Sequence, residues 1–148
     1  MQPFPHTYAV ATIATPAGEV VLTSAGLEPL TTAAPAEFDG PGHRWSPETM
    51  IAGAVANCFV LTFRAIANAS QFHWASLAVD VSGTLERIER VTRFTAFTIR
   101  ATLEIPAEAS EKQARRLLTK AETTCLITRS LNATVHLALD VRAVQAAV

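Results

Sequence analysis

The chain has 148 residues, of which 49% are hydrophobic and 17% charged, the size and composition of one globular domain with a substantial core. A formal net charge of −1 gives no electrostatic basis for binding nucleic acid or acidic membranes, and the N-terminus lacks the basic and apolar regions of a secretory signal. We therefore expect a cytoplasmic protein, in which a cysteine pair is more often redox-active or metal-binding than a structural disulfide.

The first 44 residues predict a small hairpin followed by a loop. Residues 8–13 and 19–23 favour two short strands, joined by a Thr-Pro-Ala-Gly turn at 15–18. Residues 24–44 are rich in Gly and Pro, so we expect mostly loop with a short strand near Thr31.

A long helix is predicted from Ser46 to about Asn68. Ser46 is a good N-cap, Pro47 suits the first helical position, and Glu48 complements the positive end of the helix dipole. No charged residue lies between Glu48 and Arg64, so the helix is apolar on all sides and we expect a central helix buried on all sides. Its length and its content of Ala, Gly and Asn argue against a membrane span.

The second half of the chain predicts strands at 74–84 and 94–105, a charged connection at 85–90, a helix at 110–121 and a last strand at 134–141. Because strands and helices do not alternate regularly, we expect an α+β fold with antiparallel sheets, forming one domain over residues 1–148. A single small sheet cannot cover a helix that is apolar all round, so we also expect a second copy of the chain to cover it in an obligate homodimer.

The two cysteines, Cys58 and Cys125, are not in a Cys-x-x-Cys motif. A lone cysteine in an apolar helix is most often a small core residue. Cys125, however, follows Thr123 and Thr124 where one more helical turn is predicted to begin, and a helix N-terminus lowers the pKa of a thiol. The cysteines are therefore candidates for either packing or redox chemistry.

Metal binding and hydrolysis are weaker interpretations of the same residues. The cysteines and histidines match no zinc spacing, so we expect no metal. A Cys–His hydrolase needs a base beside the thiol, and His43 or His136 could supply it only through the fold.

Glu48 and Cys58 lie ten residues apart on the predicted helix. At about 1.5 Å per residue, roughly 15 Å of helix axis separates them, so they cannot touch within one chain. If they share a site, Glu48 must come from the partner subunit; otherwise Glu48 is only a charge that complements the helix dipole.

Three segments together resemble the OsmC/Ohr superfamily: Ser46-Pro47-Glu48, Cys58-Phe59, and the Ala-Glu-Thr-Thr-Cys-Leu-Ile-Thr stretch at 121–128. Gly83-Thr84-Leu85 and the strand ending at Pro106 fit the same pattern, so the resemblance covers about residues 45–141. It implies an OsmC-like α+β fold in an intertwined homodimer with two long central helices packed back to back.

The resemblance also implies a thiol-dependent peroxidase that acts on organic hydroperoxides without a cofactor. Cys58 matches the peroxidatic cysteine and Cys125 the resolving cysteine, which form an intramolecular disulfide. A dithiol reduces that disulfide, and in the best-known branch of the superfamily the dithiol is a lipoylated protein. The apolar residues Met50, Phe59 and Phe63 are then expected to line the substrate site.

This sequence departs from the family at one position. Glu48 matches a glutamate that orients an arginine from the first hairpin, but no Arg or Lys precedes Arg44 here, so Arg44 is the candidate replacement. Because burial raises the pKa of a thiol, we expect Cys58 to ionise less readily than in relatives that carry the arginine. The alternatives are a small-molecule binding protein without peroxidase activity and a cysteine-dependent hydrolase or acyl-transfer enzyme.

Overall fold

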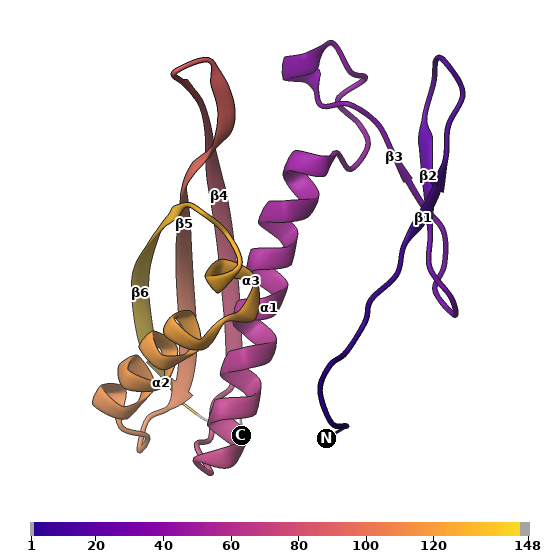
Figure 1. The fold of residues 1–148 in the computed structure, drawn as a ribbon. Helices are drawn as coiled ribbons and strands as arrows, with labels where there is room; N and C mark the ends of the chain where they lie inside the picture. Colours follow the sequence, from indigo (N-terminus) through magenta and orange to yellow (C-terminus); the bar gives the residue numbers. More distant parts are fainter. Residues whose placement is uncertain (1, 146–148) are drawn as a thin grey trace. The chain divides into compact units, whose positions relative to one another are not determined.

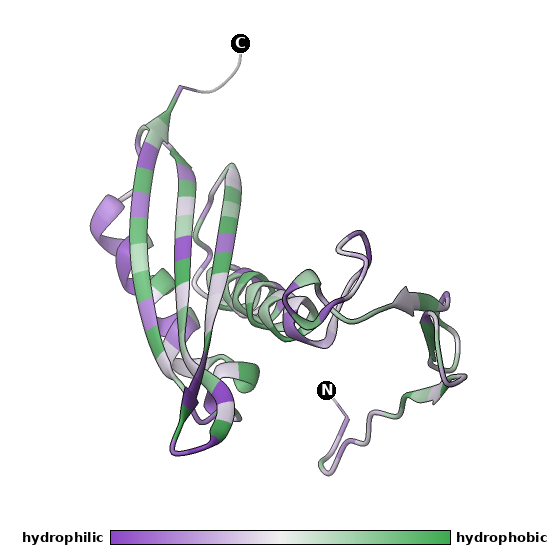
Figure 2. Ribbon diagram, turned by 90° about the horizontal axis from the view of Figure 1, so that it is seen from above, coloured by the Kyte–Doolittle hydropathy of each residue, from purple (hydrophilic) through white to green (hydrophobic). Residues whose placement is uncertain are grey.

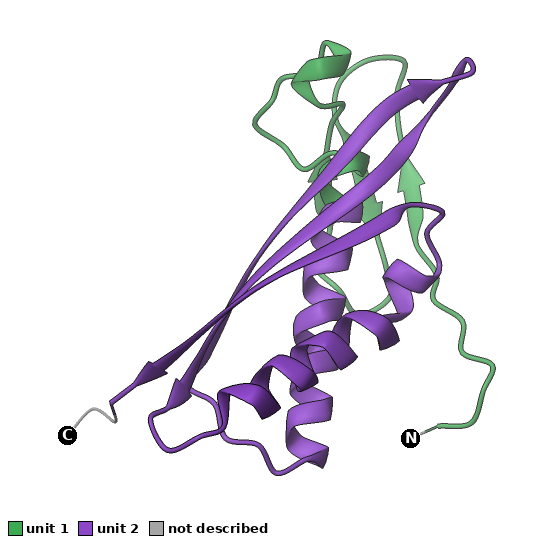
Figure 3. Cartoon of the chain, turned by 90° about the vertical axis from the view of Figure 1, so that its left-hand side faces the viewer, with its two compact units in different colours: residues 1–50 green, residues 51–148 purple. Residues whose placement is uncertain are grey.

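The computed structural model describes residues 2–145, which form two compact units, unit 1 up to residue 50 and unit 2 from residue 51 (Figure 3). Each unit has its own three-stranded sheet. The sequence predicts one domain with α+β architecture; the α+β class is confirmed.

Unit 1 is an antiparallel sheet of β1 (Ala11–Ile13), β2 (Val20–Thr23) and β3 (Leu30–Thr32), followed by a short 3-10 helix, η1 (Ala36–Phe38). The predicted hairpin and the strand near Thr31 are therefore confirmed. The loop after β3 is tied back to the start of the next helix, because the Ala33 N–H donates to the Trp45 carbonyl at 3.0 Å.

The long helix α1 (Pro47–Ala69) begins where the sequence predicts. The Ser46 hydroxyl accepts from the Thr49 N–H at 3.2 Å, and the Thr49 hydroxyl accepts from the Ser46 N–H at 2.8 Å. This reciprocal pair is a capping box with threonine in the place of the usual glutamate or glutamine, and it satisfies two backbone donors at the helix start.

In a single chain, α1 is buried on one face only. Its fully buried residues, spaced four apart, are Val55, Phe59, Phe63 and Ala67, whereas Leu61 on another face is 50% exposed. One chain therefore does not cover α1 on all sides, and its cover by a second copy stays a prediction. The expectation that α1 is too short for a membrane span is wrong, because its 23 residues are long enough and apolar enough on average; one stripe of the helix is nevertheless buried in the core of unit 2.

Unit 2 is built on β4 (Ser76–Ile88), β5 (Val91–Pro106) and β6 (Thr134–Val144) in that order (Figure 1). β4 and β5 are antiparallel, but β6 pairs with β5 in parallel, so the prediction of purely antiparallel sheets is wrong here. Two helices, α2 (Glu111–Thr124) and α3 (Leu126–Arg129), connect β5 to β6 along the chain. This helical crossover returns the chain to the same end of the sheet, as parallel pairing requires.

The residues predicted as a charged connection, 85–90, mostly extend the β4–β5 hairpin. The ladder continues to the pair Ile88–Val91, and only Glu89 and Arg90 form the turn. Both turn residues have positive φ, 49° and 69°, as a tight hairpin turn requires at both central positions. The turn was missed because neither residue is Gly or Asn.

The core of unit 2 joins the buried stripe of α1, one face of the sheet and the apolar face of α2. Figure 2 shows apolar and polar residues alternating along the three strands. Besides the α1 residues, the buried side chains are Phe72, Phe97, Ile99, Ala101, Leu103, Ile105, Ala114, Leu117, Leu118 and Ala121. Phe63 also packs edge-on against Trp74, with ring centroids 5.5 Å apart, so α1 is fixed to the sheet along its length.

We predict that Gly83→Ala destabilises the protein by about 1–3 kcal/mol, because the added Cβ lies 2.8 Å from ring carbons of both Phe94 and Phe97. These rings stack with centroids 5.0 Å apart and leave no room for an added methyl group. The free energy of unfolding in urea measures the effect. Ser82→Ala is the control, because Ser82 is exposed on the other face of β4, and we expect a change within about 0.5 kcal/mol. Equal values for the two variants would contradict this packing.

Candidate functional site

The two free cysteines occupy different environments in unit 2. Cys58 lies in the middle of α1 beside the buried stripe and is partly exposed, whereas Cys125 is fully buried at the junction of α2 and α3. The Cys125 backbone is fixed by its N–H, which donates to the Glu122 carbonyl, and by its carbonyl, which accepts from the Thr128 hydroxyl, both at 3.2 Å. One thiol is thus accessible and the other is held inside.

The fold brings the two cysteines close together. Figure 1 shows α3 beside the middle of α1, and the Cys125 thiol and the backbone N–H groups of Leu126 and Ile127 lie near enough to the Cys58 sulfur to stabilise its thiolate. The Thr62 hydroxyl, one helical turn after Cys58 on α1, lies 3.8 Å from that sulfur. Four potential donors are therefore grouped around one sulfur atom.

These donors lower the pKa of Cys58 below its ordinary value of 9.0. Burial is the largest single influence and raises this pKa, but the Ile127 N–H, the Cys125 thiol, the Thr62 hydroxyl and the Leu126 N–H together outweigh it. The expectation that Cys58 ionises less readily than in relatives that carry the arginine stays a prediction, but burial does not by itself decide the pKa of this thiol. Neutral hydrogen-bond donors stabilise the thiolate within this one chain.

The pKa of Cys125 moves the other way. Burial raises it most, and the neighbouring Cys58 raises it further, both by accepting the Cys125 hydrogen bond and by its charge. The Thr128 N–H and hydroxyl lower it only in part. The prediction that the start of α3 would activate Cys125 is thus corrected: Cys125 caps α3, while the first N–H groups of α3 serve Cys58.

Two of the predicted substrate-lining residues belong to the core. Phe59 and Phe63 are fully buried among the sheet and α2 side chains, so within this chain no substrate can reach them. Sequence analysis misplaced them because an all-apolar helix does not reveal which stripe faces the sheet. Met50, the third, is half-buried and lines a pocket in unit 1.

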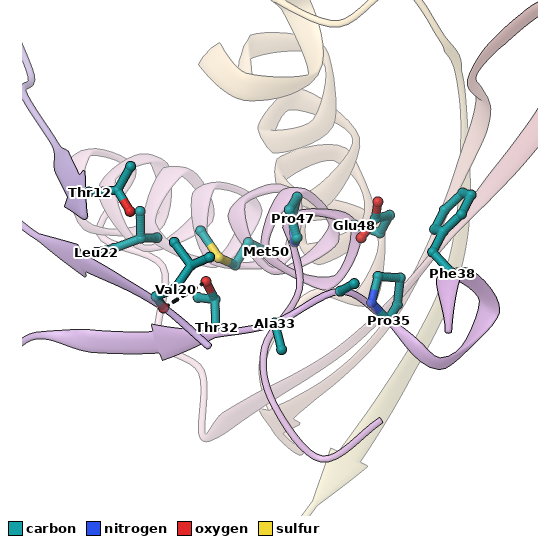
Figure 4. Close-up of a pocket in the computed structure, with 11 residues that line it drawn as sticks. Thr12, Val20, Leu22, Thr32, Ala33, Pro35, Phe38, Pro47, Glu48 and Met50 are labelled. Atoms are coloured by element: carbon teal, nitrogen blue, oxygen red, sulfur yellow. Dashed lines mark hydrogen bonds between the residues drawn. The ribbon is translucent and has the colours of Figure 1, made fainter. Parts of the chain in front are cut away.

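Glu48 and Arg44 lie in unit 1 and do not pair with each other. The Arg44 Nε lies 2.5 Å from Glu19 Oε1, and both side chains are 42% exposed. Glu48 lines the same pocket as Met50 (Figure 4), and its Oε2 is buried without a hydrogen-bond partner among residues 2–145. Arg44 is therefore engaged at the surface, and its predicted role as an activating cation has no support in this arrangement.

Three groups that act on Cys58 were missed by sequence analysis. Thr62 could have been found, because a polar residue four positions after the cysteine on a helix lies on the same face. The amides of Leu126 and Ile127 could not, because backbone groups leave no mark in the sequence and depend on where α3 docks. No histidine is among the groups that act on the Cys58 sulfur, and residues 2–145 contain no cluster of three potential metal ligands.

Comparison with known proteins gives a consistent result. The model of the OsmC-like protein family matches residues 40–140. The uncharacterized protein YmaD of Bacillus subtilis (strain 168) is 29% identical over 109 residues, which cover 72% of this chain and 73% of YmaD.

Two solved structures show the same fold at low sequence identity. An OsmC-like protein of unknown function from Vibrio cholerae has a TM-score of 0.81 at 14% identity, over 91% of this chain and 99% of that one. An organic hydroperoxide resistance protein OsmC from Legionella pneumophila has a TM-score of 0.74 at 23% identity, over 96% of this chain and all of that one.

We predict that Cys58 alkylates at lower pH than Cys125, because only the thiolate reacts and the two pKa values lie on opposite sides of 9.0. The rate of iodoacetamide labelling at each cysteine, followed by mass spectrometry across a pH series, measures both. Thr62→Val should move the Cys58 midpoint to higher pH, because it removes one donor to the thiolate.

Thr119→Val is the matched control, because its hydroxyl bonds only to the Arg115 carbonyl on α2. Arg44→Ala should also leave the midpoint unchanged, since Arg44 pairs with Glu19. A Cys58 midpoint above 9.0, or one that rises in Arg44→Ala but not in Thr62→Val, would contradict activation by neutral donors.

Proposed function

The chain belongs to the OsmC-like protein family, and from this premise we propose that it is a thiol-dependent peroxidase that reduces organic hydroperoxides. Solved structures that share its fold include organic hydroperoxide resistance proteins. The observation that carries the proposal is the contact between two thiols of opposite character: a partly exposed Cys58 with a lowered pKa and a buried Cys125 with a raised pKa.

In the first step, the Cys58 thiolate attacks the terminal oxygen of the hydroperoxide. The O–O bond breaks, the alkoxide leaves and takes a proton to become an alcohol, and Cys58 becomes a sulfenic acid. The sulfur loses two electrons and the peroxide gains them. Because the donors around Cys58 lower its pKa, the thiolate is present at a lower pH than for an ordinary thiol.

In the second step, Cys125 attacks the sulfenic sulfur of Cys58. The S–O bond breaks, hydroxide leaves with the Cys125 proton as water, and the disulfide forms. Oxidation of Cys58 also removes the negative charge that raises the pKa of Cys125. The resolving thiol therefore becomes easier to ionise only after the peroxide has reacted, which orders the two steps.

An external dithiol completes the cycle by thiol–disulfide exchange. Of the two sulfurs, Cys58 is the one with solvent exposure, so we propose that the reductant attacks there and leaves Cys125 as the departing thiol. A lipoylated protein is the candidate that the family suggests.

A homodimer is the second part of the proposal. Leu61 of α1 is half exposed, and many apolar residues of the same helix are only partly buried in one chain, so a second copy is the simplest cover for them. If this dimer forms, we predict that Glu48 of the partner subunit lies near Cys58.

We predict that Cys58→Ser reduces cumene hydroperoxide consumption to the background of the reaction without protein. Cys125→Ser should still react once, because its Cys58 thiolate remains, but it should then accumulate sulfinic acid since nothing resolves the sulfenic acid. Mass spectrometry distinguishes the outcomes: loss of two hydrogens in the wild type, and gain of two oxygens in Cys125→Ser. Undiminished turnover in Cys58→Ser would show that the peroxidatic assignment is wrong.

We predict a homodimer of about twice the 15.8 kDa chain mass at micromolar concentration, measured by light scattering. Leu61→Asp should raise the dissociation constant about tenfold or more, because it places a charge where the second copy is proposed to cover an exposed leucine. Thr119→Asp, an exposed change on α2, is the control. A folded wild-type monomer at that concentration would contradict the dimer.

A further inference from the structure

Thr128 is a buried polar side chain that the steps proposed above leave without a role. It lies in α3, three residues after Cys125, and is 6% exposed. Among residues 2–145, the other buried polar residues are Thr32 and Ser46, which both lie in unit 1. A buried hydroxyl is costly unless it makes a hydrogen bond, so the groups around the Thr128 hydroxyl indicate what it does.

The Thr128 hydroxyl has one hydrogen to donate and two acceptors within reach. It donates to the Cys125 carbonyl at 3.2 Å, and it also lies near enough to the Cys125 sulfur to stabilise a thiolate there. The carbonyl does not depend on this bond, because the Arg129 N–H donates to the same oxygen at 3.2 Å. Since a charged acceptor binds a donor more strongly than a neutral one, the hydrogen is free to turn to the sulfur when the sulfur becomes charged.

Cys125 has to carry negative charge twice in the proposed cycle. It attacks the sulfenic sulfur of Cys58 as a thiolate, and it leaves as a thiolate when the external dithiol attacks Cys58. Cys125 is fully buried, and burial opposes that charge. Of the groups that act on the Cys125 sulfur, Cys58 on α1 is the titratable one, and it also opposes the charge. The groups that favour the charge are the N–H and the hydroxyl of Thr128.

We propose that Thr128 is a positioning residue whose hydroxyl turns from the Cys125 carbonyl to the Cys125 sulfur as charge develops there, and so speeds both the formation and the opening of the Cys58–Cys125 disulfide. The inference rests on the redox roles proposed above and deepens them. In the opening step, a thiolate of the dithiol attacks Cys58, the S–S bond breaks, and Cys125 leaves with the electron pair. The second thiol of the dithiol then displaces Cys58, so the dithiol is oxidised and both cysteines are reduced.

The opening step can be tested without a peroxide. Diamide takes the two thiol hydrogens and becomes a hydrazine, which leaves the disulfide, and dithiothreitol then opens it. Acid quenching, alkylation and mass spectrometry give the rate of opening. We predict that Thr128→Val opens about three- to tenfold more slowly than the wild type, because it removes a hydrogen bond to a charge that is partly formed in the transition state. Thr128→Ala should be slowed in the same way, and Thr128→Ser, which keeps the hydroxyl, should open at the wild-type rate.

Ser130→Ala is the matched control. The Ser130 hydroxyl donates to the Leu126 carbonyl within the same short helix, and it is not among the groups that act on either sulfur. Its variant should therefore open at the wild-type rate. The pH midpoint of Cys58 alkylation is the second readout. It should be unchanged in Thr128→Val, because the α3 amides act on the Cys58 sulfur and Thr128 does not.

Three results would overturn the proposal. Opening of the Thr128→Val and Thr128→Ala disulfides at the wild-type rate would show that the hydroxyl does not act on the departing sulfur. Equal slowing in Ser130→Ala, or a Cys58 midpoint that rises in Thr128→Val, would show that the threonine only holds α3 closed. A wild type that forms no disulfide with diamide would remove the step itself. A wild type that forms and opens the disulfide but consumes no cumene hydroperoxide would contradict the peroxidase proposal alone.

Discussion

The hydrogen bonding around one sulfur atom is the interaction on which the candidate chemistry depends. Cys58 sits in an apolar helix, where burial alone would keep it protonated, and four neutral donors reverse that tendency. Two of those donors are the first amides of α3, which Cys125 caps, and a third is the Cys125 thiol itself. One short segment thus activates the first cysteine and supplies the second.

Much of this arrangement could be predicted from the sequence, and the rest depends on contacts between distant segments. The capping residue Ser46, the alternation of the strands and the helix at 110–121 are local properties, and each was identified. The parallel pairing of β6 is not a local property, because it depends on how the helical crossover returns the chain. The stripe of α1 that faces the sheet is not local either, because an apolar sequence does not determine which side of the helix packs against the sheet.

The candidate site divides in the same way. The proposed roles of Cys58 and Cys125 follow from a family resemblance, and the missing arginine predicts a thiol that ionises less readily than in relatives that carry it. The fold compensates with groups that carry no charge, two of them in the backbone. Phe59 and Phe63 were expected to line the substrate site because they are apolar residues of the same helix, whereas the structure buries both in the core.

The smallness of α3 links thiol chemistry to local unfolding. This four-residue helix is held by few bonds of its own, among them the Thr128 hydroxyl to the Cys125 carbonyl and the Ser130 hydroxyl to the Leu126 carbonyl. Segments of this kind open far more often than the whole protein unfolds. Each opening withdraws the Leu126 and Ile127 amides and returns Cys58 toward an ordinary thiol. The thiolate population of Cys58 therefore falls as α3 spends more time open, so the reactivity of this cysteine depends on the local stability of α3.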